Sequence, residues 1–458
     1  MPLPQLACLA LALLTVTPLL AFDAEAAGCE RATAYVASTK LVRSRGRTYV
    51  TYLDVGFRVQ VMALDHATGR WDGPVAVGQA DDNHGGAALA VTPDGVLHLC
   101  FGPHGTPTRY VHSLAPGDIH RWSEPERVGV RTTYPSLVAA PDGALYLVYR
   151  GHDQPEATEW LQWQLTFHVR PPGGPWGRGV VLADMPSETD QPRANYHHRL
   201  LLDAHGRLHV AWASILVAPG RVHYLCSDNG GRTWRASPGG SPVTIPATNA
   251  APPAVYVSRE ANLMVSLAVD REGVPHLLYG PEYGSGSVSH AVPRGVRGWW
   301  ETDGFRLPDS TVWLHQAAFD THGNLHVMLF SEQPGQWLGN TAILREAVWA
   351  PGGTWQLRTV ADLTRYRRGC FMPALATGDH LECLFYSGRD LDRATTEAGV
   401  TGHVATDVYY ADLTDNWMQR IAPRPGPRVA ISTQWQTPLQ TLSPMPAEDI
   451  VSPPPGGR

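Results

Sequence analysis

Polar turns and alternating apolar strands follow one another along most of this chain, and one such unit recurs seven times. Each copy has a turn around a glycine, followed by a run in which apolar and polar residues alternate. Glycine accepts the positive φ that a tight hairpin turn requires, and alternation with a period of two is typical of a half-buried strand. The copies read RSRGRTYVTYLD around Gly46, TPDGVLHLCFG around Gly95, APDGALYLVYRG around Gly143, DAHGRLHVAWAS around Gly206, DREGVPHLLYGP around Gly273, DTHGNLHVMLFS around Gly323 and ATGDHLECLFYS around Gly378.

The spacing of the copies predicts the fold. Successive turn glycines lie 48 to 67 residues apart, which is enough for a four-stranded antiparallel sheet, and seven such sheets in a ring form a seven-bladed β-propeller. We therefore predict an all-β protein of this architecture. The alternative is an irregular chain of β-sandwiches, but sandwiches do not repeat one hairpin seven times. The segment SDNGGRTW in the fourth copy matches the Asp-box turn of sialidase-like propellers, which concerns the fold and not the activity.

The ends of the chain differ from the repeats. Residues 6–22 are almost wholly apolar and small residues follow as far as Gly28, a pattern that predicts a secretory signal peptide over residues 1–28. The propeller is expected over residues 29–420, and the Pro-rich residues 421–458 are expected to form a loose tail. No later run reaches 18 apolar residues, so we expect no membrane span. The predicted location is extracellular or periplasmic.

Composition and charge exclude some classes of protein. Hydrophobic residues make up 43% of the chain, with 15 Trp and 16 Tyr, so an ordered core is expected. The net charge is -6 and the basic residues are not clustered, which argues against nucleic-acid binding. Lys40 is the only lysine, and the arginines that replace it elsewhere suit bidentate recognition of carboxylates. Cysteines are few, although Cys370 and Cys383 could face each other across a hairpin.

Polar residues gather where the innermost strands of a propeller would reach the mouth of its central channel. Before four of the repeated turns, the sequence places His84, Tyr134, Tyr196 with His197, and His315. After two of the turns, the outgoing strand ends in His104 and in Arg150. An arginine can neutralise a carboxylate while a tyrosine or histidine moves a proton, so this set favours proton abstraction beside a carboxylate.

Other histidines and motifs do not compete with this set. Four histidines occupy one position in four copies of the repeat, which predicts a structural role; they are His98, His209, His276 and His326. The sequence has no G-x-S-x-G, H-E-x-x-H or P-loop motif. The sequence also offers few candidates for the pair of catalytic carboxylates that a glycosidase needs, although Asp82, Asp190 and Asp303 remain candidates.

The segments ADDNHGG, FGPHG, TYP, YRG and NYHHRLLLDAHGRLH, in that order, resemble the BNR-repeat seven-bladed propellers that include the ulvan lyases. The resemblance covers about residues 30 to 420 and is strongest in the second to fourth copies. It implies a polysaccharide lyase that cleaves a uronate-containing glycan by β-elimination and leaves unsaturated uronate ends. Matched one at a time, the residues of the family site fall on His84, His104, Tyr134, Arg150 and Tyr196.

The resemblance implies roles for these residues. Arg150, with help from His104, would hold the uronate carboxylate, and Tyr134, with His84, would take the C5 proton and protonate O4. Which of the two is the base stays open. Tyr196, His197 and His315 would complete the substrate-binding surface. The resemblance also implies one structural Zn²⁺, with ligands at His152, His209, His223 and Cys226, and three His plus one Cys is an acceptable tetrahedral set.

Two other functions remain in view. A sialidase-like glycoside hydrolase would need three clustered arginines, a Tyr-Glu pair and an acidic Asp. A non-catalytic carbohydrate-binding propeller would repeat its aromatic pockets in several blades, whereas here the polar groups gather in the second to fourth copies. That asymmetry favours one catalytic site. The expected partner is an anionic polysaccharide bound by a monomer, with no nucleic acid and no membrane, and the sequence does not identify the polymer.

Overall fold

The computed structural model describes residues 27–152, 163–185, 194–215, 218–258, 264–280, 285–294, 298–350, 354–376, 380–389, 391, 404–435 and 440–441. The predicted signal peptide therefore lies almost entirely outside the described residues. Within them, the chain forms 32 strands and one short 3-10 helix, η2 (Thr364–Tyr366). The prediction of an all-β protein is confirmed. No helix in the described part is long and apolar enough to cross a membrane.

The strands form six antiparallel sheets. The first contains β1 (Leu41–Ser44), β2 (Arg47–Leu53), β3 (Arg58–Asp65) and β4 (Arg70–Gln79). The second contains β5 (Ala88–Val91), β6 (Leu97–Phe101), β7 (His104–His112), β8 (Glu126–Ala139), β9 (Leu145–His152), β10 (Gln164–Arg170) and β11 (Val180–Ala183). The third contains β12 (Ala194–His197), β13 (Leu201–Leu202), β14 (Leu208–Ile215), β15 (Gly220–Ser227), β16 (Trp234–Arg235), β17 (Pro242–Val243) and β18 (Tyr256–Ser258).

The remaining three sheets complete the chain. The fourth contains β19 (Val265–Val269), β20 (Pro275–Tyr279), β21 (Ser287–Pro293), β22 (Trp299–Arg306) and β32 (Gln440–Thr441). The fifth contains β23 (Thr311–Phe319), β24 (Leu325–Glu332), β25 (Ile343–Trp349) and β26 (Trp355–Ala361). The sixth contains β27 (Gly369–Leu375), β28 (Glu382–Gly388), β29 (Asp407–Asp412), β30 (Trp417–Ala422) and β31 (Arg428–Ala430). Two short strands, β31 and β32, thus come from the segment that was expected to be a loose tail.

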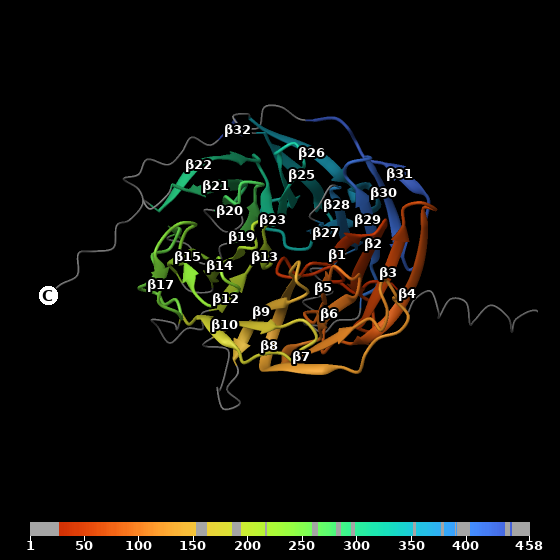
Figure 1. The fold of residues 1–458 in the computed structure, drawn as a ribbon. Coiled ribbons are helices and arrows are strands. Elements are labelled where there is room, and N and C mark those ends of the chain that lie inside the picture. Colours follow the sequence, from red (N-terminus) through yellow and green to blue (C-terminus); the bar gives the residue numbers. More distant parts are fainter. Residues whose placement is uncertain are drawn as a thin grey trace, which may run out of the picture.

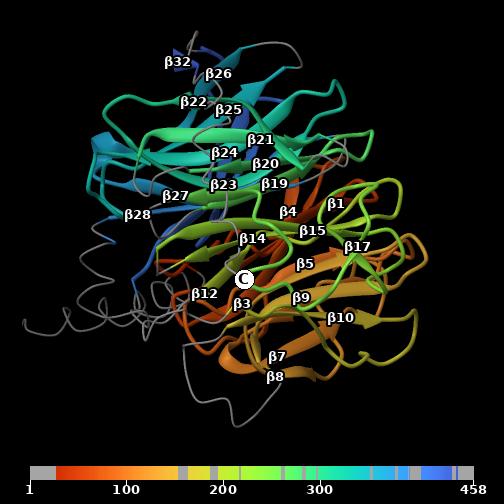
Figure 2. The same cartoon turned by 90° about the vertical axis from the view of Figure 1, so that its left-hand side faces the viewer.

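The sheets follow one another around a common centre, and the first sheet meets the last (Figure 1, and Figure 2 from the side). Glu382 on β28 lies at this junction and is fully buried. Its carboxylate accepts hydrogen bonds from Thr48 Oγ1 at 2.8 Å, Arg43 Nη1 at 3.0 Å and Tyr410 OH at 2.7 Å. The first two donors belong to the first sheet, so one buried carboxylate joins the two ends of the chain.

The long strand β8 explains why there are six sheets and not seven. Its first half pairs with β7 and its second half with β9, and the two pairings overlap at Thr132 and Thr133. One strand is therefore the last of one four-stranded group and the first of the next, and the two groups count as a single sheet.

The repeated turns form as predicted. The turn glycines Gly95, Gly143, Gly206, Gly273 and Gly323 have φ between 78° and 91°, and each turn joins the innermost strand of a group to the strand beside it. Gly378 lies outside the described residues. Apolar side chains pack between neighbouring groups, as where β22, β23, β24 and β26 contribute Phe305, Leu314, Val327 and Trp355 to one buried cluster. Full burial of each such side chain stabilises the fold by about 1.5–3 kcal/mol.

The SDNGGRTW segment forms a turn held by its own polar side chains. Ser227 Oγ accepts the backbone N–H of Gly231 at 2.9 Å, and Asn229 Oδ1 accepts that of Thr233 at 2.9 Å. Trp234 is buried and packs edge-on against Phe167 at 5.3 Å between ring centres. Cys370 and Cys383 are both buried free thiols, because Cys370 faces Ser387 and Cys383 faces Leu375 in the β27–β28 ladder.

Candidate active site

Five of the predicted residues come together around the starts of the innermost strands. His84 precedes β5, His104 begins β7, Tyr134 lies in β8, Arg150 in β9 and Tyr196 in β12. The rings of His84 and His104 stack with centres 4.1 Å apart, and the centres of Tyr134 and Tyr196 are 5.6 Å apart. His84 lies 6.1 Å from Tyr134 between ring centres. The two histidines and the two tyrosines therefore form one continuous surface.

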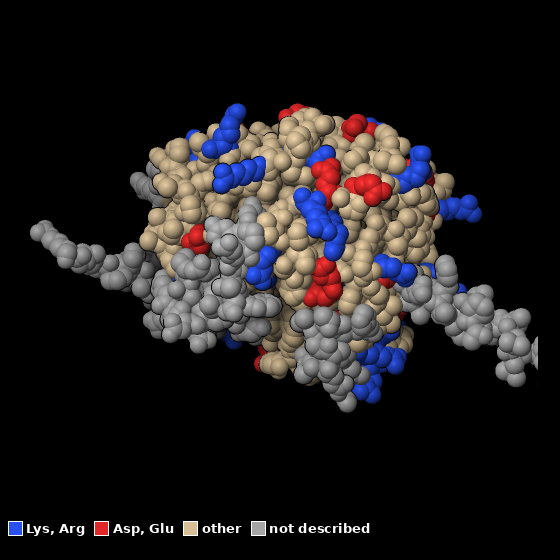
Figure 3. Space-filling model, turned by 90° about the horizontal axis from the view of Figure 1, so that it is seen from below, with Lys and Arg blue, Asp and Glu red and all other residues tan. Residues whose placement is uncertain are grey.

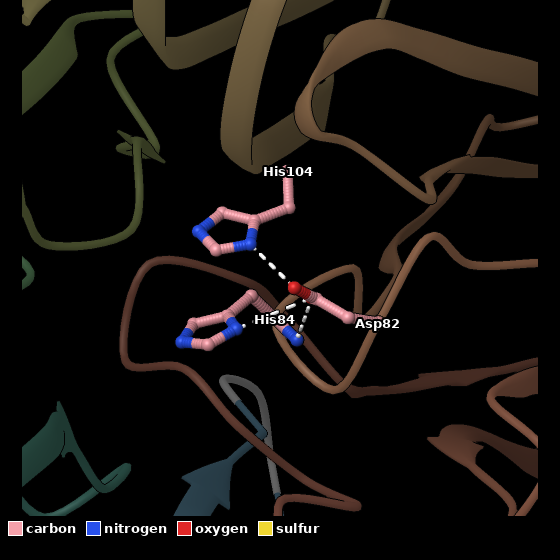
Figure 4. Close-up of side chains that lie close together, drawn as sticks. All are labelled: Asp82, His84 and His104. Carbon is pink, nitrogen blue, oxygen red and sulfur yellow. Dashed lines mark hydrogen bonds and ion pairs between the residues drawn. The ribbon is translucent and has the colours of Figure 1, made fainter. Parts of the chain in front are cut away.

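Asp82 connects the two histidines, and Figure 4 shows both imidazoles beside its carboxylate. Its Oδ2 lies 2.5 Å from Nδ1 of His104, and its Oδ1 lies 3.2 Å from Nδ1 of His84. Its Oδ1 also accepts the backbone N–H of His84 at 2.7 Å. Burial acts to raise the pKa of Asp82, but the hydrogen bonds from His104 and His84 outweigh it and hold the pKa well below its ordinary value. Asp82 is therefore a carboxylate at neutral pH.

Tyr134 is placed by a distortion of its strand. The register of β8 against β9 shifts between Thr133 and Ser136, and Tyr134 has a φ of 54°. A bulge of this kind turns a side chain out of the regular alternation, and a positive φ at a residue other than glycine stores strain that is typical of functional sites. The register shifts in β23 and β27 have the same form, so the bulge is a recurring property of the innermost strands.

Arg150 is buried against aromatic rings. Its Cζ lies 4.6 Å from the ring centre of Tyr134, 4.2 Å from that of Tyr196 and 4.8 Å from that of Trp163. The side chain is 3% exposed, and its Nε has no hydrogen-bond partner. Within the described part of the chain no carboxylate forms an ion pair with it. A buried guanidinium with no carboxylate partner among the described residues keeps its capacity to bind an anion.

The two tyrosines beside Arg150 have pKa values shifted in opposite directions. Burial acts to raise the pKa of Tyr196, but the charge of Arg150 and hydrogen bonds from Arg150 and Tyr134 outweigh it and lower the pKa. Burial, together with the proximity of Tyr196 and Tyr35, raises the pKa of Tyr134 well above its ordinary value. A pair of like groups with opposite shifts can hold one proton acceptor and one proton donor.

Two residues of the site were missed by the sequence analysis. Arg31 Nη1 donates to Tyr35 OH at 2.6 Å and to Nε2 of His84 at 2.6 Å. The Tyr35 ring lies 4.6 Å from that of Tyr134 and 5.4 Å from that of His84. Burial raises the pKa of Tyr35 to about 12, against the opposing charge of Arg31. Both residues precede the first repeat, where no pattern in the sequence marks them.

The comparison with protein families gives a match over residues 47–304 to the BNR repeat-containing family. That range is more than half of the chain and includes every residue of the cluster except Arg31 and Tyr35. The chain belongs to this family.

Known proteins similar to this BNR-repeat family member include ulvan lyases. The ulvan lyase of Nonlabens ulvanivorans is 28% identical over 149 residues, which are 27% of this chain and 32% of that protein. The Ulvan Lyase-PL25 of Pseudoalteromonas sp. (strain PLSV) is 25% identical over 134 residues, 24% of this chain and 27% of that protein. The matched region thus spans about a third or less of these relatives. The predicted resemblance to the group that includes ulvan lyases is confirmed.

Solved structures extend the likeness to the fold. A PL25 ulvan lyase structure superposes with a TM-score of 0.61 at 14% identity, over 84% of this chain and 94% of that one. The same values hold for that lyase bound to a -[GlcA(1-4)Rha3S]- unit. The polysaccharide lyase Uly1 gives a TM-score of 0.52 at 15% identity, over 82% of this chain and 89% of that one.

Two predicted substrate-binding residues of this family member are buried beside or away from the cluster. His197 is buried, and burial, with the charge of Arg150, lowers its pKa to about 3. His315 is buried on β23, its ring 5.5 Å from that of Phe330, and burial lowers its pKa to about 3. No hydrogen bond or ring contact among the described residues joins His315 to the cluster. Both are neutral imidazoles at physiological pH.

The predicted zinc ligands do not converge. His209 faces Cys226 across the β14–β15 ladder, whereas His223 faces Trp212. Positions three apart on a strand point to opposite faces, so His223 lies on the other side of the sheet. His209 also uses Nδ1 on Tyr224 OH at 2.6 Å and Nε2 on Asp203 at 3.1 Å. The side chain of His152 lies outside the described part. These donors do not fit one zinc ion, and no step proposed below uses a metal.

Two other groups in the described residues bring three possible ligand atoms within 4.8 Å of one another. One is the Asp82, His84 and His104 group, whose members already satisfy one another through hydrogen bonds. The other is His380, Asp412 and Asp415 at the outer end of the sixth sheet.

The opposite ends of the innermost strands surround a separate hollow. A cavity of about 990 Å³ is lined by β1, by the ends of β5, β8, β13, β19 and β23, and by the turns that follow these strands. None of the clustered residues lines it. The candidate active site therefore lies at one end of the innermost strands only.

Proposed function

We propose that this protein is a secreted polysaccharide lyase that cleaves a uronate-containing glycan by β-elimination. One observation carries the proposal: Arg150, a buried arginine that has no acid partner among the described residues, lies against two tyrosines whose pKa values are shifted in opposite directions. The likeness to ulvan lyases supports the same reaction class. Basic and acidic side chains are interspersed on the face seen in Figure 3, so the visible part of this face offers no broad basic surface to an anionic glycan.

The reaction begins with the carboxylate of the uronate against Arg150. Pairing with a guanidinium withdraws charge from the carboxylate and makes the C5 proton more acidic, and the developing enolate binds the same group more strongly. One phenolate of the Tyr134–Tyr196 pair removes the C5 proton. The electron pair forms the C4–C5 double bond as the C4–O4 bond breaks, and the other tyrosine, as a phenol, protonates the departing O4. One proton is thus taken and one given, and no co-reactant is needed.

The seven-bladed architecture belongs to the same proposal. Its support is the double pairing of β8, which divides the seven-stranded sheet into two groups of four that share this strand. With the other five sheets, this division gives seven units around the ring. Secretion and a monomeric state remain predictions, as does the identity of the polymer.

The test is to incubate the purified protein with a panel of uronate polysaccharides. A lyase produces ultraviolet absorbance from the conjugated double bond of the unsaturated uronate. New reducing ends without this absorbance would point to a hydrolase, and binding without either signal would point to a carbohydrate-binding propeller. Cleavage of rhamnose–glucuronate polymers but not of polymers without uronate would support the proposed substrate class.

A further inference from the structure

Arg31 contacts two members of the candidate active site with a single nitrogen. Its Nη1 lies 2.6 Å from Nε2 of His84 and 2.6 Å from Tyr35 OH. Arg31 is 7% exposed and its Nε is buried without a hydrogen-bond partner. A guanidinium has five N–H donors and no acceptor, so Arg31 is the donor in both hydrogen bonds. Nε2 of His84 must accept.

The direction of this bond fixes the state of His84. An imidazole nitrogen that accepts a hydrogen bond carries no proton, and the proton of a neutral ring is then on the other nitrogen. Nδ1 of His84 lies 3.2 Å from Oδ1 of Asp82, which can only accept. Both nitrogens of His84 are therefore occupied, one by a donor and the other by an acceptor.

The groups around His84 favour the neutral ring. Asp82 attracts a positive charge on His84, whereas Arg31 and His104 disfavour it, and the phenols of Tyr35 and Tyr134 complete the surroundings. Burial, with the charges of Arg31 and His104, lowers the pKa of His84 to about 4 despite Asp82. A second proton on Nε2 would also break the Arg31 bond and place two cations 2.6 Å apart.

We infer that Arg31 is a positioning residue that locks His84 as the neutral tautomer with its proton on Nδ1, and so excludes His84 from proton transfer. The inference rests on the proposed lyase function for its meaning, because it leaves the tyrosines, not His84, to exchange protons with the glycan. Arg31 also anchors Tyr35, whose ring packs against Tyr134. Through these two neighbours, Arg31 sets the position of Tyr134 without contacting the scissile bond.

The first test measures the tautomer without any substrate. In protein labelled with ¹⁵N in histidine, the His84 signals, assigned by their loss in His84→Gln, should show a neutral ring with the proton on Nδ1. They should not titrate between about pH 5 and 8. In Arg31→Met, Nε2 is released and one cation is removed, so the His84 pKa should rise and the ring should titrate within that range. Titration of His84 in the wild type, or unchanged signals in Arg31→Met, would overturn the inference.

A matched control separates the loss of this bond from the loss of any nearby arginine. Arg109 Nη2 pairs with Oδ1 of Asp81 at 3.0 Å, one residue from Asp82, and has no contact with a histidine among the described residues. Arg109→Met should leave the His84 signals unchanged. Arg31→Lys keeps a donor and a positive charge, so it should retain the wild-type tautomer. Thermal denaturation of each variant verifies that it is folded.

Turnover provides the second readout. Displacement of Tyr134 and Tyr35 in Arg31→Met should lower kcat by roughly 10²-fold, the effect of a misplacement of about 1 Å, with a smaller change in KM. The pH profile of kcat should gain a limb in the range where His84 now titrates, and Arg31→Lys should recover part of the rate. If the protein cleaves no glycan at all, the proposed function fails but the tautomer test still decides the role of Arg31.

Discussion

Histidine–acid pairs occur at both ends of the innermost strands, and only those at one end belong to a candidate active site. At the turns, His209 and His326 each use both ring nitrogens in the same way. In each, Nδ1 is hydrogen-bonded to a side chain of the neighbouring strand. Nε2 is hydrogen-bonded to the aspartate of the turn, at 3.1 Å between His209 and Asp203 and at 3.2 Å between His326 and Asp320. These bonds form closed local networks that tie a turn to its sheet. Residue type alone therefore does not identify chemistry here.

The cluster at the other end is connected differently. Asp82 is shared by two histidines, one of them is held by Arg31, and the aromatic surface continues to a second arginine, Arg150. Two buried arginines without a carboxylate partner in the described residues leave positive charge available for a ligand. The comparison teaches that uncompensated charge beside phenols distinguishes the site, since the histidine–aspartate pairs are common to both ends.

The largest effect is expected for Arg150. Arg150→Ala should lower turnover by roughly 10²–10³-fold, because a donor aimed at the developing enolate is lost, while glycan affinity changes much less. Arg150→Lys keeps the charge but loses the planar fork and should also be impaired. Steady-state kinetics and binding calorimetry measure both quantities, with Arg109→Ala as the exposed-arginine control. Normal turnover in Arg150→Ala would remove the basis of the proposed function.

The tyrosines should come next. Tyr134→Phe and Tyr196→Phe are each expected to lower kcat by about 10²-fold, the lower end of the usual contribution of a positioned acid or base. Because the pKa of Tyr196 is lowered and a base must be deprotonated, wild-type turnover should rise with pH through the pKa of Tyr196. Tyr134→Phe should keep this rising limb, and Tyr196→Phe should lose it. The reverse result would exchange the two roles.

Paired aspartates test the comparison directly. Asp82→Asn should reduce turnover about 10-fold or more because it frees both histidines, whereas Asp203→Asn should affect stability alone. The pKa of Asp82 is lower in the folded protein, so its bonds stabilise the fold above the ordinary Asp pKa of about 3.9 and are lost as the pH falls below it. Melting temperatures of wild type and Asp82→Asn should therefore converge at low pH. A loss of turnover in Asp203→Asn would make the two ends equivalent.

The smallest effect is expected for His209. His209→Gln leaves Tyr224 and Asp203 without their partner and should cost about 1–3 kcal/mol in the free energy of unfolding, measured by urea denaturation, with turnover unchanged. A chelator should not alter the melting temperature of the wild type. A marked fall would mean that His209, His223 and Cys226 rearrange around a metal.

The sequence predicts the fold because each repeat carries its own turn. A turn glycine such as Gly95 or Gly206 indicates a hairpin from local sequence alone. The alternation of apolar and polar residues after it shows which side chains of the strand are buried. The number of sheets could not be predicted from the sequence, because it depends on the pairing of β8 with both β7 and β9. The zinc prediction is not supported by the arrangement, because His223 and Cys226 lie three residues apart on β15 and therefore point to opposite faces, while His209 pairs with Cys226.

The site was predictable only where it touches the repeats. His84, Tyr134, Arg150 and Tyr196 each lie 7 to 11 residues from a repeated turn glycine. Arg31 lies before the first repeat, and its proximity to His84 depends on how that segment packs against the loop before β5. No local pattern contains that information, because the contact joins a segment outside the repeats to the loop before β5.

The segment that carries Arg31 is held by the far end of the chain. Gly28 exchanges backbone hydrogen bonds with Thr406, and Thr33 Oγ1 donates to the carbonyl of Met372 at 2.8 Å. During synthesis the amino-terminal residues leave the ribosome first, yet their anchors are made more than 300 residues later. The same segment is bonded to the end of β2, where Cys29 N–H donates to the carbonyl of Leu53 at 3.1 Å, but its bonds to Thr406 and Met372 can form only when nearly the whole polypeptide has emerged. The complete set of bonds around Arg31 is therefore one of the last features of the fold to form.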